Sequence, residues 1–149
     1  MRKSKKAVKP PANKEEILLE WVRKNPLLTN KTLLNFLGDN DGQVSIAPIG
    51  ETAVEKYIDG SKLVHYDFLW AAMFTVSEET DTTNTDSMFE LRLWQNWIDG
   101  QNEKGDLPDF GGGYDMYQVE NLASPNLAII YENNKAKYQF PARLVYLEK

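Results

Sequence analysis

The first candidate for acid–base catalysis is His65, the single histidine of the chain. Asp67 lies two positions further on, and a His–Asp pair can activate a serine hydroxyl as a nucleophile. No motif that presents such a nucleophile accompanies the pair. The chain also lacks cysteine, which excludes thiol catalysis, cysteine-ligated zinc and iron–sulfur chemistry. We therefore interpret His65 as a structural residue of a strand.

A second candidate is the segment Gly38-Asp39-Asn40-Asp41-Gly42, which superficially resembles the start of a calcium-binding loop. A loop of the hand type needs glycine at its sixth position and a bidentate glutamate at its twelfth. Counted from Asp39, these positions hold Val44 and Gly50. The pattern therefore predicts a turn between two elements and no metal site.

Carboxylates are numerous, but none is set apart as catalytic. Between residues 78 and 120, eleven acidic side chains are accompanied only by Arg92 and Lys104. Acid–base catalysis needs a carboxyl group whose apolar setting raises its pKa, and acids scattered over loops and an exposed helix face are usually solvated. The residues therefore predict no enzyme activity and no cofactor.

The net charge of −5 is an average over two unlike regions. Residues 1–14 hold six basic and no acidic residues, whereas the 135 residues that follow hold 11 basic and 22 acidic ones. We predict a flexible basic arm over residues 1–13 and one acidic domain over residues 14–149. The arm is either a solubilising tail or a strand that docks on an acidic partner or on phosphates. Its charges are Arg2, Lys3, Lys5, Lys6 and Lys9.

Two polar segments are predicted to be surface loops. The first covers residues 77–85 and includes Glu78, Glu79 and Asp81. The second covers residues 101–115 and has three consecutive glycines, but it lacks the Lys-Ser/Thr of a phosphate-binding loop. It is either simply flexible or it orders on contact with a partner, with Phe110 and Tyr114 as anchors. Its expected contact residues are Asp106, Asp109, Phe110, Gly111, Gly112, Gly113 and Tyr114.

The hydrophobic pattern predicts the elements that position these loops. A helix begins after Asn13, a second short helix covers residues 30–38, and a third runs from Asp86 to Asp99. Strands are predicted near residues 44–46, in a hairpin over residues 52–76, and over residues 116–122, 127–131 and 136–147. The order ααβββαβββ, with about six strands, predicts an α+β fold. A mostly antiparallel sheet packs against an N-terminal helix and one central amphipathic helix.

Two further features place the chain outside a membrane. The basic start is followed by Pro10-Pro11 where a signal peptide needs an apolar segment, and the longest apolar run, residues 68–74, is far below the ~20 residues of a membrane span. We expect a soluble protein.

Pro141 cannot donate to a strand ladder, so the last strand is expected to lie at an edge or to be bulged there.

The segment Glu55-Lys56-Tyr57-Ile58-Asp59-Gly60-Ser61-Lys62 precedes a long strand. A polar loop, an amphipathic helix over residues 89–98, a loop with Leu107-Pro108 and an aromatic strand over residues 138–146 follow in that order. Together these features resemble the tail terminator, or tail completion, family of siphophages that infect Gram-positive bacteria. Its small members are often labelled minor capsid proteins. The resemblance covers roughly residues 14–148, and the basic arm lies outside it.

This resemblance implies a structural virion protein and not an enzyme. Tail terminators form a homo-oligomeric ring, commonly a hexamer, which caps the tail tube and stops its polymerisation. The ring also forms the head–tail joining surface for the connector, or stopper, protein. DNA passes through it without specific binding, and no membrane is involved. The implied location is the head-proximal end of the virion tail, after assembly in the host bacterial cytoplasm.

Within a ring, acidic loops would repel DNA and keep it mobile. We expect Glu78, Glu79 and Asp81 to line the lumen and the glycine-rich loop to contact the tube or connector. The strand over residues 136–147, with the long strand 62–76, is expected to form subunit contacts through Tyr138, Phe140, Leu144 and Val145. The alternative is a small acidic inhibitor or immunity-type protein, which explains the acidic domain but not the basic arm. A hydrolase using two carboxylates lacks an organised site.

Overall fold

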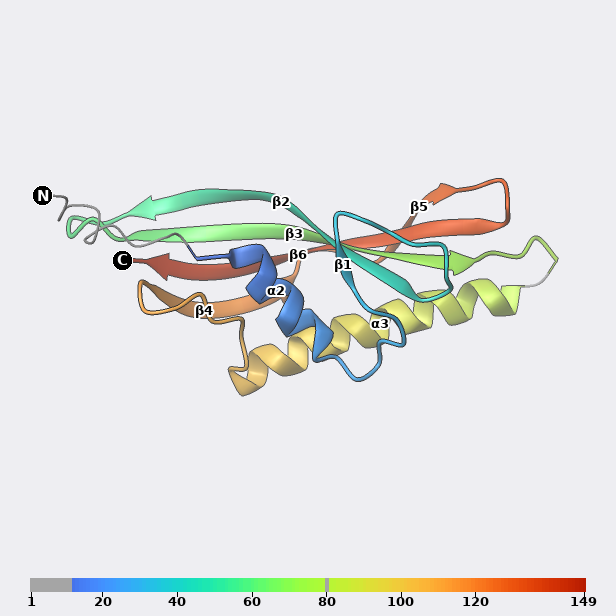
Figure 1. Ribbon diagram of the computed structural model, residues 1–149, viewed down its shortest axis with the longest axis horizontal. Coiled ribbons are helices and arrows are strands. Elements are labelled where there is room, and N and C mark those ends of the chain that lie inside the picture. Colours follow the sequence, from blue (N-terminus) through green and yellow to red (C-terminus); the bar gives the residue numbers. More distant parts are fainter. Residues whose placement is uncertain (1–11, 80) are drawn as a thin grey trace, which may run out of the picture.

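The computed structural model describes residues 12–79 and 81–149. Six strands form one sheet with the order β1-β2-β3-β6-β4, and β5 also pairs with β6. All pairings are antiparallel except that of β1 with β2, so the predicted α+β fold is confirmed (Figure 1). The elements are α2 (Lys14–Arg23), β1 (Leu33–Leu34), β2 (Gln43–Lys56), β3 (Lys62–Thr75), α3 (Asp81–Lys104), β4 (Tyr114–Asn121), β5 (Asn126–Ile130) and β6 (Lys135–Glu148).

The centre of the sheet is the pair β3 and β6, which are 14 residues each and pair along their whole length. The sheet is strongly twisted: β2 lies above β3 in the left half of Figure 1 and below it in the right half. The predicted strand near residues 44–46 and the first arm of the predicted hairpin are one continuous strand, β2. Register shifts at Pro48/Gly50 and Ala53/Glu55 let this strand follow the twist.

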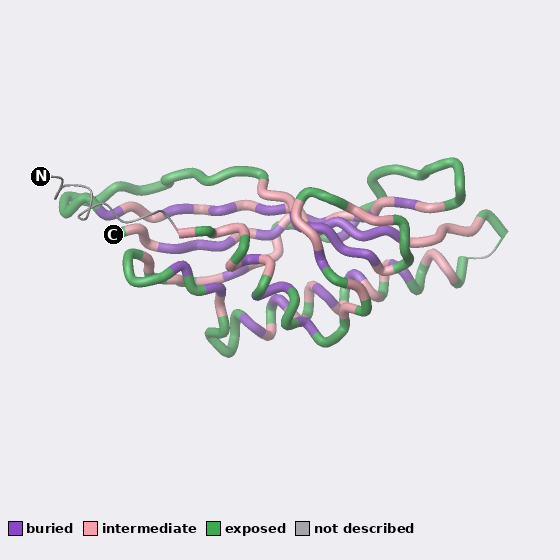
Figure 2. The backbone as a smooth tube through the Cα atoms, viewed as in Figure 1, coloured by how far each residue is buried: buried purple, intermediate pink, exposed green. Residues whose placement is uncertain are grey.

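Both helices pack on the same face of the sheet. Alternate residues of β3 and β6 point to this face, and the purple segments of Figure 2 run along the middle of these strands. Trp70 stacks on Phe140 with ring centroids 5.4 Å apart and contacts Trp94 of α3 at 5.7 Å. Val64, Tyr66, Phe68 and Trp70 alternate along the second strand of the predicted hairpin, and all four belong to the core.

The start of the first helix is confirmed as well. Asn13 caps α2, and its Oδ1 accepts a hydrogen bond from the backbone amide of Glu16 at 3.2 Å. The predicted second helix over residues 30–38 is wrong. Its backbone bonds to distant elements instead: the Thr32 carbonyl accepts from Arg23, and the Asn35 amide donates to the Ile46 carbonyl at 2.9 Å. Asn35 also has a φ of 56°, which lies in the left-handed region and is incompatible with a right-handed helix.

The central helix is longer than predicted at both ends. Its first turns tolerate threonine and serine because their hydroxyls donate to carbonyls of the preceding turn, as Ser87 does to Thr83 at 3.1 Å. Gly100 lies inside α3, and Gly105 ends it with a φ of 74°. The Asp106 amide then donates to the Gln101 carbonyl at 2.9 Å, which closes the helix in a Schellman arrangement.

The last strand is central, so its predicted edge position is wrong. β6 pairs with β3 on one side and with β4 and then β5 on the other. Pro141 lies where this second neighbour changes, between Gln139, opposite β5, and Ala142, opposite β4. The Pro141 carbonyl accepts from the Leu122 amide at 3.0 Å. In an antiparallel strand, the N–H and C=O of one residue point to the same side. The N–H that proline lacks would therefore point to the side where β5 gives way to β4, so no ladder hydrogen bond is lost.

Candidate functional site

The two predicted acidic loops lie at opposite ends of α3. Glu78 and Glu79 are exposed in the loop that follows β3, and Asp81 is the first residue of the helix. Asn84 fixes this loop because its side chain accepts from the Ser77 amide and donates to the Ser77 carbonyl, both at 3.0 Å. The second loop begins at the other end of a 24-residue helix, about 36 Å away. The two loops therefore lie on different parts of the molecular surface (Figure 1).

The glycine-rich loop is shorter and better anchored than predicted. Residues 101–104 belong to α3, and Tyr114 belongs to β4. The Asp106 carbonyl accepts from Trp21 Nε1 at 2.8 Å, and Gln101 Nε2 donates to Asp106 Oδ2 at 2.7 Å. Phe110 is buried in the core, so its predicted role as an exposed anchor is wrong. Its ring packs against those of Tyr66, Tyr114 and Tyr146, and the exposed residues are Asp106, Asp109, Gly111, Gly112 and Gly113.

The predicted subunit-contact residues are mostly inaccessible to a neighbour, although Tyr138 lines a surface groove between α3 and β5. Tyr138, Phe140 and Leu144 point to the helix-covered face and are buried, and Val145 on the opposite face is buried too. The prediction treated β6 as an edge strand, and its central place in the sheet is the reason for the error. Of the basic arm, Arg2, Lys3, Lys5, Lys6 and Lys9 lie outside the described residues.

A polar cluster holds the start of α2 on the sheet. Lys14 Nζ donates to Glu51 Oε1 at 2.6 Å and to the Tyr146 hydroxyl at 3.1 Å. The Tyr146 hydroxyl donates to the same Glu51 oxygen at 2.6 Å. Beside it, the Tyr66 hydroxyl donates to Glu15 Oε2 at 2.6 Å. Lys14, which directly follows the predicted arm, is therefore held on the sheet by these contacts.

The charges of this cluster are stabilised in their ordinary forms. Partial burial alone would lower the pKa of Lys14, but the hydrogen bonds to Glu51 and Tyr146 outweigh it, and the pKa is raised. Partial burial alone would raise the pKa of Glu51, but the bonds from Lys14 and Tyr146 hold it below its usual value. Burial and the bond to Glu15 raise the pKa of Tyr66. The cluster is therefore an ion pair with neutral tyrosines at physiological pH.

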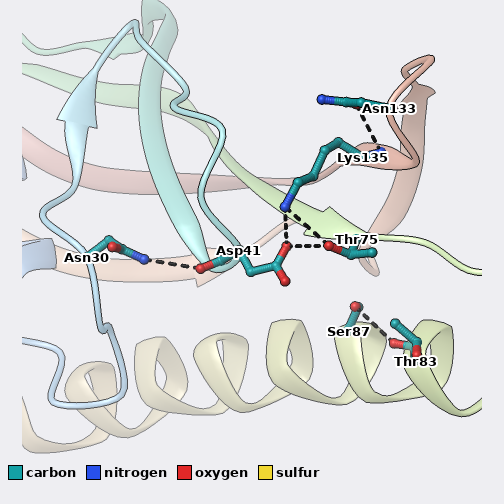
Figure 3. Close-up of polar contacts among 7 residues, drawn as sticks. All are labelled: Asn30, Asp41, Thr75, Thr83, Ser87, Asn133 and Lys135. Atoms are coloured by element: carbon teal, nitrogen blue, oxygen red, sulfur yellow. Dashed lines mark hydrogen bonds and ion pairs between the residues drawn. The ribbon is translucent and has the colours of Figure 1, made fainter.

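A second polar cluster joins the far ends of β2, β3 and β6 (Figure 3). Asp41 Oδ1 accepts from Lys135 Nζ at 2.9 Å and from Thr75 Oγ1 at 2.8 Å, and the Asp41 carbonyl accepts from Asn30 at 3.1 Å. The bond from Lys135 lowers the pKa of Asp41. Because Lys135 is committed to Asp41 as a donor, it is not a base that could activate the Thr75 hydroxyl.

A pocket of about 390 Å³ lies between this cluster and α3. Figure 3 shows Thr83 and Ser87 of α3 across from Thr75. The pocket combines aromatic side chains with carboxylates, and its lining holds no histidine or cysteine. Its residues are Leu27, Thr29, Asp41, Gly42, Phe74, Thr75, Thr83, Asp86, Ser87, Glu90 and Trp94.

Large apolar side chains are exposed in several parts of the chain, and two of these parts are separate surfaces. Tyr57 and Ile58 form the β2–β3 turn at one end of the molecule, and Ile58 is fully exposed (Figure 1). Phe89 of α3 and Leu127 of β5 are 62% and 46% exposed and line one groove. Phe89 begins the predicted amphipathic segment over residues 89–98, but it does not belong to the buried face of the helix. The buried face instead runs through Leu91, Trp94 and Ile98.

No family model matches the sequence, and no curated protein is similar to it at a significant level. Within residues 12–79 and 81–149, no helix combines the length and apolar character needed to cross a bilayer. The same residues contain no group of histidine, cysteine and carboxylate side chains arranged to hold a metal ion.

Proposed function

We propose that this chain is a ring-forming tail terminator, which caps a phage tail tube and presents the head–tail joining surface. The observation that carries the proposal is the exposure of large apolar side chains on two separate parts of an elongated chain, the β2–β3 turn and the groove between α3 and β5. Apolar side chains that gather in an exposed patch mark contact surfaces. A closed ring needs head-to-tail contacts between two different surfaces of the same chain, and these two parts can supply them.

The placement of the acidic loops supports the same proposal. In the proposed ring, Glu78, Glu79 and Asp81 line the lumen, where their charge repels the phosphates of passing DNA. Asp106, Asp109 and the exposed glycines 111–113 lie at the other end of α3 and contact the tail tube or the connector. Glycines without side chains let the backbone of this segment approach a partner closely.

The bonds that hold the second loop refine its proposed role. Trp21 and Gln101 fix its start, and buried Phe110 fixes its middle. A loop held in this way loses little conformational freedom when it meets a partner, which favours affinity. The tube or connector therefore docks on a preformed surface, and docking does not order the loop.

Electron microscopy of tail tubes incubated with purified, gold-labelled protein tests this function. We expect label at one end of each tube and an arrest of further tube polymerisation. The matched control is the same protein denatured before labelling, which should leave tubes unlabelled and still growing. Label along the tube walls, or continued growth of tubes with intact protein, would show that the chain is not a terminator.

A further inference from the structure

The tip of the β2–β3 hairpin exposes apolar side chains, and a groove beside α3 has apolar walls. We propose that the hairpin tip of one copy docks in the groove between α3 and β5 of the next copy. This inference rests on the proposed ring and names its subunit contact. The tip is defined as residues 56–59. The groove is lined by Asp81, Asn84, Thr85, Met88, Phe89, Arg92, Leu127 and Tyr138.

The tip is a rigid apolar projection. Ile58 is fully exposed at its end, beside Tyr57. The Tyr57 amide donates to the Ser61 carbonyl at 2.9 Å, and Asp59 Oδ1 accepts from the Ser61 amide and hydroxyl at 2.9 and 2.6 Å. Gly60 supplies the φ of 90° that the turn needs. The tip is thus fixed before binding, so little conformational entropy is lost on docking.

The groove offers a site of suitable size and polarity. Its volume is about 570 Å³, within the range of roughly 300–1,000 Å³ that pockets for small ligands have. Met88, Phe89, Leu127 and Tyr138 supply apolar walls from α3, β5 and β6. Phe89 and Leu127 are large side chains left in water, and burying them against an apolar partner is favourable.

The charges at the two surfaces are complementary. Lys56 and Asp59 flank Ile58 on the tip, while Asp81 and Arg92 lie at the groove. Docking can therefore pair each base with an acid of the other copy. Arg92 is exposed and forms no ion pair among the described residues, which leaves its charge free for a partner.

The strand edges near the tip and the groove are poorly suited to pairing between copies, and the edge strand β4 has a register shift between Met116 and Gln118. On β2, Pro48 and the register shifts after it and after Ala53 interrupt a regular edge. β5 has only five residues and a register shift between Leu127 and Ile129. Contacts through the side chains of the tip are therefore favoured over addition of strands to the sheet.

The geometry requires that the contact joins different molecules. The tip lies at the left end of Figure 1, and β5 and the start of α3 lie in its right half. A tip cannot reach the groove of its own chain, so each copy donates a tip to one neighbour and accepts one from another. Such a contact is heterologous and closes into a ring when the rotation between copies permits.

The absence of cysteine allows a direct crosslinking test. Ile58→Cys and Phe89→Cys are made in separate full-length chains, mixed and oxidised. A disulfide forms only when the two side chains approach closely, with Cβ atoms about 4 Å apart. Phe36→Cys replaces Phe89→Cys as the matched control, because Phe36 is 62% exposed but belongs to neither surface. The readout is the yield of crosslinked dimer on a denaturing gel.

We expect the Ile58→Cys and Phe89→Cys mixture to crosslink at least about tenfold more than the control mixture. In sedimentation, Ile58→Asp should weaken self-association by a similar factor while Phe36→Asp leaves it unchanged. Equal crosslinking with the control, or a wild-type chain that stays monomeric up to near-millimolar concentration, would overturn the contact. Rings that form equally well with Ile58→Asp would overturn it and leave the terminator proposal standing. Crosslinking between Ile58→Cys and Phe89→Cys in a protein that does not cap tubes would overturn the terminator proposal and leave the contact standing.

Discussion

Trp21 of α2 and Trp97 of α3 lie with their ring centroids 4.8 Å apart and their planes tilted by 51°. The contact joins the two helices on the covered face of the sheet. Trp21 also donates from Nε1 to the Asp106 carbonyl at 2.8 Å, which ties the end of α3 to α2. One side chain therefore connects the helical layer to the start of the proposed docking loop.

Replacing Trp21 tests this connection. Trp21→Ala should lower the free energy of unfolding by about 3–5 kcal/mol, because it leaves a cavity in a buried site. Trp21→Phe retains a ring but removes the bond to Asp106, so a smaller loss of about 1–2 kcal/mol is expected. Urea unfolding followed by circular dichroism measures both. A Trp21→Phe variant that is as stable as the wild type would contradict the role of the Nε1 bond.

Phe110 and Phe89 form a matched pair for testing burial. Phe110→Ala should cost about 3–5 kcal/mol of stability, since the ring fills the core beside Tyr66 and Tyr146. Phe89→Ala should change stability by less than about 0.5 kcal/mol, because its ring is mostly exposed. Thermal and urea unfolding of both variants provides the comparison. A larger loss for Phe89→Ala would mean that its ring belongs to the core.

The Lys14–Glu51 pair predicts a pH dependence of stability. The pKa of Glu51 in the folded chain lies below its ordinary value of 4.5, so the pair stabilises the fold above that pH. This contribution is lost as the pH falls through the folded pKa. Lys14→Gln should cost about 1 kcal/mol at neutral pH, a modest amount because the carboxylate is partly solvated.

Urea unfolding of wild type and Lys14→Gln between neutral pH and about pH 3 measures this dependence. The difference between the two proteins should shrink as the pH falls below 4.5, the ordinary pKa of a glutamate. Lys24→Gln is a suitable control, because Lys24 and Asp106 are 3.8 Å apart and both are well exposed. A difference for Lys14→Gln that is constant with pH would show that the variant loses packing and not the ion pair.

The proposed lumen loop predicts an effect on DNA passage with little effect on folding. The double variant Glu78→Gln, Glu79→Gln removes two negative charges and leaves Asp81, which also lines the groove of the proposed subunit contact. It should change stability by less than about 0.5 kcal/mol, because both side chains are exposed. DNA ejection from phage carrying the variant should be slower, as measured by dye-based ejection assays. Unchanged ejection with normal tails would place this loop outside the lumen.

Several elements of the fold follow from local sequence. The spacing of apolar residues in β3 and β6 predicts both strands, and Asn13 with Glu16 predicts the start of α2. The region 30–38 could not be predicted in this way, because its structure depends on bonds from Arg23 and to Ile46, which are distant in sequence. Leu33 and Leu34 fit the pattern of a helix as well as they fit that of a short strand.

The contact surfaces were harder to predict than the elements. Tyr138 and Phe140 are aromatic residues of a strand with a proline, which is typical of an edge, yet the pairing with β3, β4 and β5 buries them. Phe110 stands among glycines and aspartates, and only its position against β3 and β6 makes it a core residue. Conversely, Ile58 is exposed because it lies in the turn of the β2–β3 hairpin, and Phe89 is exposed because it lies off the buried face of α3.

The length of tail tubes in a phage whose copy of this gene is disrupted tests the central claim most directly. Tails are imaged by electron microscopy and compared with those from the same phage complemented by the wild-type chain. A terminator predicts tubes of variable, excessive length that lack attached heads, with uniform length and joined heads restored on complementation. Tails of normal, uniform length attached to heads in the absence of the protein would contradict the account.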